Sequence, residues 1–131
     1  LMFTKKTASP SQVKGLYYEK LALKYLKKQG LKFLQNNYHC RLGEIDLVMH
    51  DQGYIVFIEV RYRENSAFGN GLDTVNKSKQ QKLIKTAQLY LIQNGLYEKV
   101  PTRFDVISIS RSKLKPELSW VKNAFQNEIT N

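Results

Sequence analysis

The sequence predicts an α/β sandwich in which helices flank a mixed β-sheet. Two stretches, residues 9–30 and 76–94, repeat their apolar residues at helical spacing, and several shorter ones alternate polar and apolar residues as strands do. The order along the chain is helix, three strands, helix and one or two further strands. The 131 residues, 42% of them hydrophobic, suffice for one domain with a packed core, which we expect over residues 9–126.

The first predicted helix begins with several N-terminal signals. Ser9 suits the N-cap, Pro10 the first helical position, and Gln12 completes a capping box, while Gly30 supplies the stop. Glu19 lies beside the apolar stripe of this helix, not on its lysine-rich face. Its carboxylate therefore points towards whatever the helix packs on, although a helix carboxylate taken alone is more often solvated.

Three strands are predicted next. Residues 31–38 form the first, which we expect to end in a polar corner at Asn36-Asn37. Residues 44–49 and 54–61 form a hairpin, because turn-forming residues, among them Gly53, separate them.

The second half of the chain is predicted to contain a helix and further strands. A loop at 64–75 leads into the helix at 76–94, which Gly95 ends. Residues 103–110 form a strand, in which Asp105 is expected to be a buried partner of Arg103, and residues 118–121 form a last strand.

The net charge of +10 is the first functional clue. A strongly basic surface attracts polyanions and makes their binding depend on salt. General solubility would explain the charge equally simply, but the lysines are clustered, with Lys20, Lys24, Lys27 and Lys28 in one group and Lys77, Lys79, Lys82 and Lys85 in another. Three acidic residues lie instead within strand-like segments. A basic shell around an acidic point suits an enzyme that cleaves phosphodiesters.

Several classes of protein are excluded by composition. Cys40 is the only cysteine, so the sequence holds no internal disulfide and no cysteine-rich zinc site. We expect no contact with a membrane, because no apolar run approaches the ~18 residues of a span. The start of the chain lacks the apolar core of a signal peptide, so the expected compartment is the cytoplasm. Residues 1–8 are expected to be a basic arm and 127–131 a tail.

The predicted hairpin brings carboxylates together. Alternate residues of a strand share a face, so Glu44 lies with Asp46, and Glu59 lies with Arg61. A two-residue turn just before Tyr54 places Asp46 opposite Glu59. Moving that turn back by one residue places Glu44 opposite Glu59 instead. In both registers the β-carbons of the opposed carboxylates are about 5 Å apart, whereas a three-residue turn would break the arrangement.

Two facing carboxylates in an apolar sheet repel unless a positive group lies between them. Arg61 is one candidate, and a divalent cation is the other, since Mg²⁺ binds carboxylates and phosphate oxygens while keeping several waters. The same residues would also suit an ordinary polar face of an edge hairpin, with Glu44 paired to Arg61 on the surface. At the start of the second helix, Lys79, Gln80 and Lys82 suit a phosphate, or simply a solvated basic face.

These motifs resemble a known signature. Residues 43–48 (GEIDLV) and 57–63 (FIEVRYR) are similar to the PD-(D/E)xK nuclease signature. With the helix element at 15–26 and the later motifs at 68–69, 78–80 and 103–106, they resemble the YraN-like family of predicted bacterial endonucleases, related to archaeal Holliday-junction resolvases. The resemblance runs over about residues 15–125.

The resemblance implies a restriction-endonuclease-like α/β sandwich and a set of site residues. Asp46 and Glu59 would be metal ligands for Mg²⁺, with Mn²⁺ as an alternative, and Glu19 a helix-borne acid that completes the site. Arg61 takes the position of the signature lysine. It stays protonated and is no general base, but it can orient water or clamp a phosphate. Glu44 would be accessory, and Arg63, Lys77, Lys79, Gln80 and Lys82 would contact nucleic acid.

The predicted activity is therefore that of a Mg²⁺-dependent, structure-selective DNA endonuclease acting on branched or nicked duplexes. The alternative, motivated by Arg61, is a nuclease-fold DNA-binding module with weak catalysis or none. Only charge favours an RNA substrate, since no RNP-type aromatic motif is present. Resolving branched DNA normally uses two active sites, so by analogy a homodimer is expected.

Overall fold

A computed structural model describes residues 9–63, 75–112 and 115–126 of the chain. The elements follow in the order α1 (Pro10–Lys28), β1 (Lys32–Cys40), β2 (Gly43–Asp51), β3 (Tyr54–Arg63), α2 (Lys77–Gln93), β4 (Thr102–Ser112) and β5 (Lys115–Phe125). The predicted arm at 1–8, the predicted tail at 127–131 and residues 64–74 of the predicted loop lie outside the described residues.

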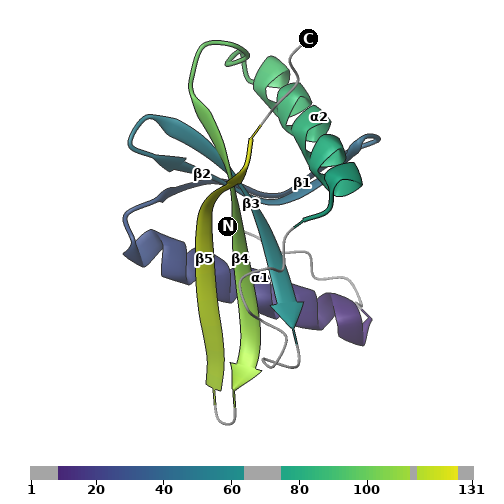
Figure 1. Ribbon diagram of the computed structural model, residues 1–131, viewed down its shortest axis with the longest axis vertical. Helices are drawn as coiled ribbons and strands as arrows, with labels where there is room; N and C mark the ends of the chain where they lie inside the picture. The colour runs from purple at the N-terminus through teal and green to yellow at the C-terminus, as the bar shows by residue number, and fades with distance from the viewer. Residues whose placement is uncertain (1–8, 64–74, 113–114, 127–131) are drawn as a thin grey trace.

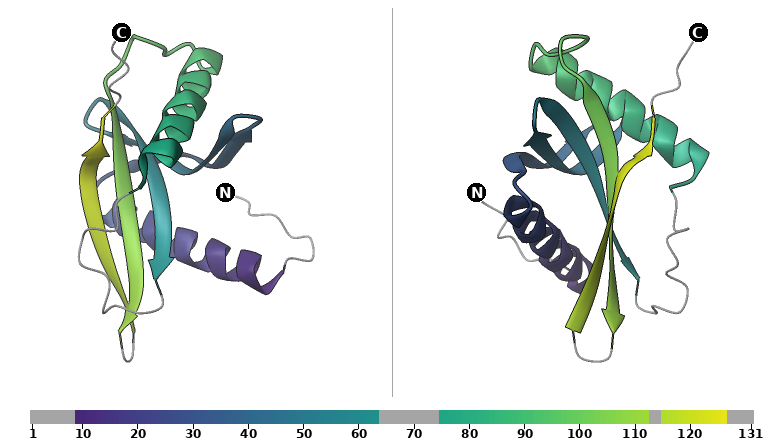
Figure 2. Two further views of the ribbon diagram at one scale, coloured as in Figure 1. Left: turned by 45° about the vertical axis from the view of Figure 1, so that its right-hand side comes forward. Right: turned by 60° about the vertical axis from the view of Figure 1, so that its left-hand side comes forward.

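The five strands form one mixed sheet in the order β1-β2-β3-β4-β5. Strands β3 and β4 are parallel, and every other neighbouring pair is antiparallel. The connection between β3 and β4 contains α2, as a parallel pair requires. Helix α2 packs on one face of the sheet and α1 crosses the other (Figures 1 and 2). This architecture confirms the predicted α/β sandwich with a mixed sheet.

Each helix covers its own hydrophobic core. Beneath α1, Ala22 and Leu26 pack on the sheet residues Leu47 and Ile58. Beneath α2, the buried residues include Leu83, Ile84, Ala87 and Leu91 of the helix and Ile45, Val48, Phe57 and Val106 of the sheet. The central strands β2 and β3 are thus buried on both faces, so polar side chains on them are enclosed unless they reach an opening.

The predicted start of α1 is confirmed. Ser9 caps the helix by accepting a hydrogen bond from the Gln12 backbone N–H at 3.2 Å, and the Gln12 side chain accepts one from the Ser9 N–H at 2.8 Å. Among the described residues, neither helix is long and apolar enough to cross a membrane.

The first strand differs from its prediction. The expected end of the strand at Asn36-Asn37 is wrong, because β1 continues to Cys40. Asn37 stays within the strand by adopting a left-handed backbone with φ 52°. Asparagine tolerates this conformation better than most residues, so a pair that resembles a turn in sequence marks an irregularity inside the strand.

The hairpin turn between β2 and β3 has the first of the two predicted registers. Asp51 pairs with Tyr54, and Gln52 and Gly53 have φ values of 49° and 91°. Positive values at both central positions are those of a type I′ turn, which matches the twist of the flanking strands. The strand pairing then runs back from this turn towards the carboxylates.

Candidate active site

The ladder between β2 and β3 opens beside Asp46. Paired positions run from Asp51–Tyr54 to Leu47–Ile58, and Asp46 instead accepts a hydrogen bond from the Val60 backbone N–H through its Oδ2 at 2.8 Å. The predicted direct pairing of Asp46 with Glu59 is therefore not formed. The two strands separate at this point, which we call the fork, and an Asp46 oxygen accepts the hydrogen bond that a backbone carbonyl would otherwise accept.

The fork coincides with a change of face along β2. Ile45 packs in the core beneath α2, while Leu47 packs in the core beneath α1, although strict alternation would put both on one face. The pairs Asn36–Leu47 and Tyr38–Ile45 enclose the irregular position on β1, where Asn37 has its positive φ. Asp46 thus lies where groups on both faces of the sheet can act on it.

Asp46 is the electrostatic centre of the site. Burial raises the pKa of its carboxyl group well above the ordinary value, and the negative charges of Glu59 and Glu19 raise it further. The Val60 N–H and the positive charge of Lys79 oppose this rise. A carboxylate in such a place is costly when ionised, and a cation placed beside it would lower that cost.

Glu19 reaches the site from α1. Burial raises the pKa of its carboxyl group, hydrogen bonds with Asn37 and Asp46 oppose the rise, and the charges of Glu44 and Glu59 add to it. Among the described residues, the buried Glu19 Oε1 has no hydrogen-bond partner. Glu19 therefore holds one unsatisfied acceptor beside Asp46.

Glu59 is held from α2. Its side chain, which is 10% exposed, accepts a hydrogen bond and ion pair through Oε2 from the Lys79 Nζ at 2.5 Å. Glu59 lies one position after Ile58 on β3, on the face that α2 covers. The ammonium group of Lys79 thus already neutralises one of the site's carboxylates.

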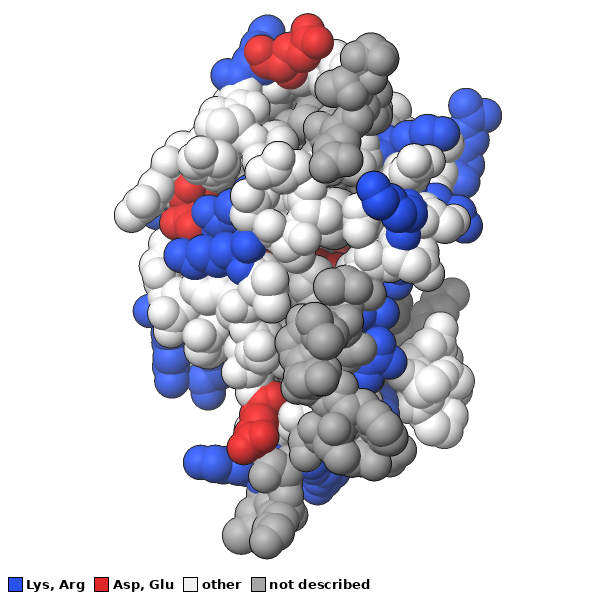
Figure 3. Space-filling model, in the orientation of Figure 1, with Lys and Arg blue, Asp and Glu red and all other residues white. Residues whose placement is uncertain are grey.

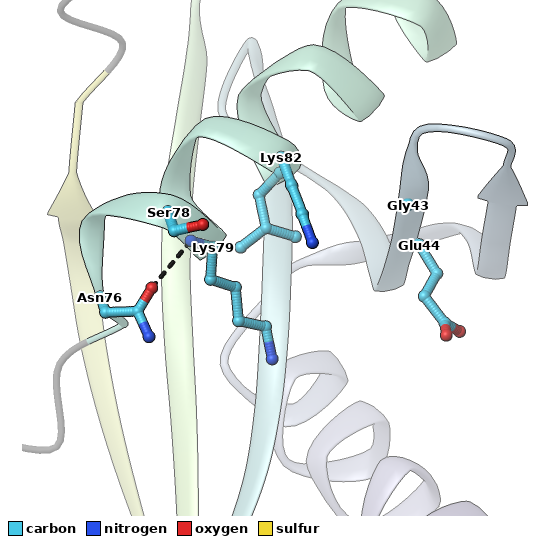
Figure 4. A pocket seen from close by; sticks show the side chains of 7 residues that line it. Gly43, Glu44, Asn76, Ser78, Lys79 and Lys82 are labelled. Carbon is cyan, nitrogen blue, oxygen red and sulfur yellow. Dashed lines mark hydrogen bonds between the residues drawn. The ribbon is translucent and has the colours of Figure 1, made fainter.

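A pocket of about 400 Å³ lies between the start of α2 and the start of β2. It is lined by Gly43, Glu44, Asn76, Ser78, Lys79, Lys82 and Leu83. Figure 4 shows Lys79 and Lys82 extending from the first turns of α2 into this space, with Glu44 across from them. The side chain of Asn76 caps the helix by accepting from the Lys79 N–H at 2.8 Å. Two lysines beside a helix N-terminus suit an anion.

Gly43 allows β2 to approach α2 closely at this pocket. A β-carbon on Gly43 would lie 2.9 Å from Thr86 Oγ1, and the residue has a φ of 155°. Thr86 is fully buried and donates its hydroxyl to the Lys82 carbonyl at 2.8 Å. The glycine before the predicted carboxylates therefore sets the distance between their strand and the lysines of α2.

The other predicted site residues are placed around this cluster. Glu44 is exposed at the rim of the pocket, and Lys77 is exposed at the start of α2. Arg61 and Arg63 are partly buried on β3, where they pair with Ser108 and Ser110 of β4. Gln80 differs from the expectation in its contacts, because its side-chain amide donates to the Val75 carbonyl at 2.7 Å. That bond anchors the segment that leads into α2.

Basic side chains outnumber acidic ones on the surface around these elements. In Figure 3, Lys and Arg appear on both sides of the face shown, and a small acidic surface is recessed near its centre. Other acidic groups lie near the top, the left edge and the bottom of the same view, so the basic shell around a single acidic point stays a prediction.

Mg²⁺ requires oxygen ligands, and the carboxylates of the site are the candidate donors. Within residues 9–63, 75–112 and 115–126, no three His, Cys, Asp or Glu side chains lie together closely enough to hold a metal ion as they stand. Mg²⁺ can bind through one or two carboxylates if waters and substrate phosphates complete its shell. Asp46 and Glu59 provide that pair, and the unsatisfied Glu19 Oε1 provides an acceptor for a water. The residues therefore fit the ion.

Sequence reasoning missed two participants. Asn37 is predicted to lie at a polar corner, yet it is one of the groups that lower the pKa of Glu19. Lys79 was expected only to contact phosphate, yet it pairs with Glu59, twenty residues earlier in the chain. An asparagine pair inside an otherwise strand-like run is the signal that pointed to the first. The second depends on how α2 packs on the sheet.

Comparison with known proteins places the chain in a family. A sequence model of the uncharacterised protein family UPF0102 matches residues 18–109. A UPF0102 protein of Legionella pneumophila (strain Corby) is 51% identical over 115 residues, which cover 88% of this chain and 96% of that protein. Another, from Stutzerimonas stutzeri (strain A1501), is 48% identical over 119 residues, covering 91% and 99%. A relative from Psychromonas ingrahamii is 51% identical over 116 residues, covering 88% and 92%.

These relatives match over nearly their whole length, and their names state a family and no activity. The matched region contains Glu19, Asp46, Glu59 and Lys79. The family part of the sequence-based resemblance is thereby confirmed: the chain belongs to the uncharacterised protein family UPF0102.

Proposed function

We propose that this protein is a Mg²⁺-dependent, structure-selective DNA endonuclease that hydrolyses phosphodiester bonds. One observation carries the proposal: acidic side chains from α1, β2 and β3 meet beside a pocket lined by lysines. A hydrolase for polyanions needs both features, a place that attracts a divalent cation and a place that attracts the phosphate.

In this proposal Asp46 and Glu59 hold the cation. The Val60 N–H fixes one oxygen of Asp46, and the other oxygen would bind the ion. When bound, Mg²⁺ supplies Lewis-acid polarisation of the phosphodiester and activation of the attacking water. Glu19 Oε1 is placed to accept a hydrogen bond from that water, because it is buried and Glu19 already contacts Asp46. A carboxylate with a raised pKa is also a better proton acceptor than an ordinary one.

The basic residues bind and orient the substrate. Lys82, Ser78 and the N-terminal turn of α2 line the pocket and would hold a phosphate of the DNA backbone. Arg61, on the same face of β3 as Glu59, would stabilise negative charge on the phosphate without exchanging a proton. Selectivity for branched or nicked DNA rests on the resemblance to resolvases, and a homodimer would supply the two sites that cutting two strands needs.

The test is cleavage of four-way-junction, nicked and linear DNA in Mg²⁺ or Mn²⁺. We expect Asp46→Asn and Glu59→Gln to lower the cleavage rate by more than about 100-fold, the upper end of the effect of removing a residue that only supports a ligand. Glu117→Gln is the matched control, because Glu117 is exposed on β5 and outside the cluster. Equal rates in all four proteins would remove these carboxylates from the mechanism.

A second candidate function is a nuclease-fold DNA-binding module with weak catalysis or none. The ion pair between Lys79 and Glu59 favours it, because the site then has a cation of its own. This candidate predicts salt-sensitive DNA binding, no cleavage and no saturable binding of divalent ions. A divalent-ion dissociation constant that is lost in Asp46→Asn would contradict it.

A further inference from the structure

We propose that Lys79 is the built-in counter-ion of the acidic site, which gives up Glu59 to a divalent cation and then binds the substrate phosphate in the adjoining pocket. The inference rests on the proposed function, because it concerns the same carboxylates. It assigns Lys79 two alternating partners, where the sequence suggested a phosphate contact alone. The competition for Glu59 makes metal binding and phosphate binding depend on each other.

The ammonium group of Lys79 already lies at one oxygen of Glu59. Lys79 Nζ lies 2.5 Å from Glu59 Oε2, so it occupies the place at this oxygen that a bound cation would take. The Glu59 side chain is 10% exposed, whereas that of Lys79 is 47% exposed. A carboxylate that is largely buried near two others needs a positive partner. A lysine that is half exposed can leave its partner at little cost in desolvation.

One Glu59 oxygen cannot serve both cations well. An ammonium and a divalent ion at the same oxygen would lie within a few ångströms of each other and repel strongly. The charge of Lys79 also acts on Asp46, the other proposed ligand. Binding of the ion therefore requires Lys79 to move away from Glu59, and the lysine lowers the affinity of the free protein for the ion.

After its release from Glu59, the ammonium group of Lys79 can enter the adjoining pocket. Lys79 lines the pocket of about 400 Å³ that Lys82, Ser78 and Asn76 also line. Its backbone N–H is fixed by the Asn76 side chain at 2.8 Å, so the base of the residue is anchored while its long side chain rotates. Figure 4 shows the Lys79 side chain extending from the first turn of α2 beside the Lys82 side chain, so a rotation of the side chain alone would bring its ammonium group to an anion there.

At the strand position of Arg61, the resemblance places a lysine in related signatures, and an arginine is permanently charged and cannot take that lysine's place in proton transfer. In the structure, the lysine that contacts Glu59 comes from α2 and not from β3. Because the ammonium group of Lys79 contacts Glu59, its release would accompany the loading of the site.

In the main experiment, Mn²⁺ is titrated into the full chain without DNA, and binding is measured by calorimetry. The variants are Lys79→Met, Lys79→Gln and, as the matched control, Lys82→Met. Lys82 lines the same pocket and carries the same charge, so its removal reports the general effect of one positive charge. We expect both Lys79 variants to bind Mn²⁺ at least five-fold more tightly than wild type, and Lys82→Met to stay within two-fold.

A second readout follows the released ammonium. The dependence of DNA affinity on NaCl is measured with and without Ca²⁺. With Ca²⁺ bound, Lys79 is free for phosphate, so the slope of log K against log [salt] should be shallower by about 0.9 in Lys79→Met than in wild type. Without a divalent ion the two slopes should agree, because Glu59 still holds Lys79. A structural role alone would not produce a difference that depends on the ion.

The outcomes separate this inference from the proposed function. If wild type binds Mn²⁺ and the Lys79 variants bind it no more tightly than Lys82→Met does, Lys79 is not the counter-ion, and the endonuclease proposal stands. If only the Lys79 variants bind Mn²⁺, the counter-ion role is supported and the protein is the binding module described above. If neither wild type nor any variant binds the ion without DNA, the counter-ion role is overturned, and the cleavage test decides the endonuclease proposal by itself.

Discussion

At the scale of one residue, the carboxylate of Asp46 lowers the stability of the fold when it is ionised. It is partly buried, and Glu59 and Glu19 add negative charge beside it. Its pKa is raised well above the ordinary value, so the folded protein binds this proton more tightly than the unfolded chain does. The free energy of unfolding therefore falls as the pH rises through the folded pKa of the group.

Because the ionised carboxylate of Asp46 costs stability, we make a prediction for Asp46→Asn in the metal-free protein. The amide cannot ionise, and its oxygen can still accept the Val60 N–H. At pH 7 we expect the variant to be more stable than wild type by on the order of 1 kcal/mol, because a raised pKa weakens the ionised form. The advantage should disappear below about pH 4, where Asp46 is protonated in both the folded and unfolded states.

The measurement is urea unfolding of both proteins in a chelator, from about pH 3, below the unfolded pKa of Asp, to about pH 8. Saturating Mg²⁺ should reverse the order at pH 7, since a ligand that binds only the folded wild type stabilises it. A variant that is less stable than wild type at every pH would show that Asp46 is stabilised by its contacts even without a cation.

At the scale of elements, the two helices bring opposite charges to the site. α1 delivers Glu19, and α2 delivers Lys79 and Lys82. Both helices begin at a capping side chain, Ser9 for α1 and Asn76 for α2. Only the cap of α2 is at the pocket, so the two caps offer a matched comparison.

We predict that Asn76→Ala lowers both stability and DNA affinity. Loss of the bond from the Lys79 N–H should cost about 1 kcal/mol and loosen the first turn of α2, which holds both lysines. Ser9→Ala should lower stability by a similar amount through the loss of its capping box, and leave DNA affinity unchanged. Chemical denaturation and DNA-binding titrations test both variants, and an equal loss of DNA affinity in the two would contradict the prediction.

At the scale of the whole molecule, one buried network joins three strands, β2, β4 and β5. Asp105 is fully buried and accepts four hydrogen bonds, from Arg103 Nε and Nη2, the Trp120 indole N–H and the Asn123 backbone N–H, at 2.9–3.0 Å. Arg103 Nη2 also donates to Asp51 at the end of β2. The expectation that Asp105 is a buried partner of Arg103 is confirmed, and β5 is attached through the same carboxylate.

We predict that Asp105→Ala destabilises the fold by about 3–5 kcal/mol, since it leaves several buried donors without an acceptor. Asp51→Ala is the control. It removes one bond to the same arginine and should cost about 1 kcal/mol. Equilibrium unfolding in urea measures both. Similar losses in the two variants would show that the buried carboxylate matters no more than its partly exposed neighbour.

The sequence alone determined those features that depend on a few adjacent residues. The capping signals at Ser9 predict the start of α1, and the turn residues around Gly53 predict the hairpin, while leaving its register open between two turns. Alternation along β3 places Glu59 on a defined face, and the ordered motifs indicate the family. Each of these signals reflects a local backbone preference or a pattern of burial, which acts over short distances in the chain.

Only the tertiary structure decided how the site is assembled. The fork at Asp46 depends on a left-handed Asn37 in a neighbouring strand, and the pairing of Lys79 with Glu59 depends on α2 packing over β3. One of the two predicted registers paired Asp46 directly with Glu59. That pairing does not form, because one irregular position reverses the faces of β2. Contacts between residues far apart in the chain follow from how the helices cover the two faces of the sheet, and no local pattern specifies that arrangement.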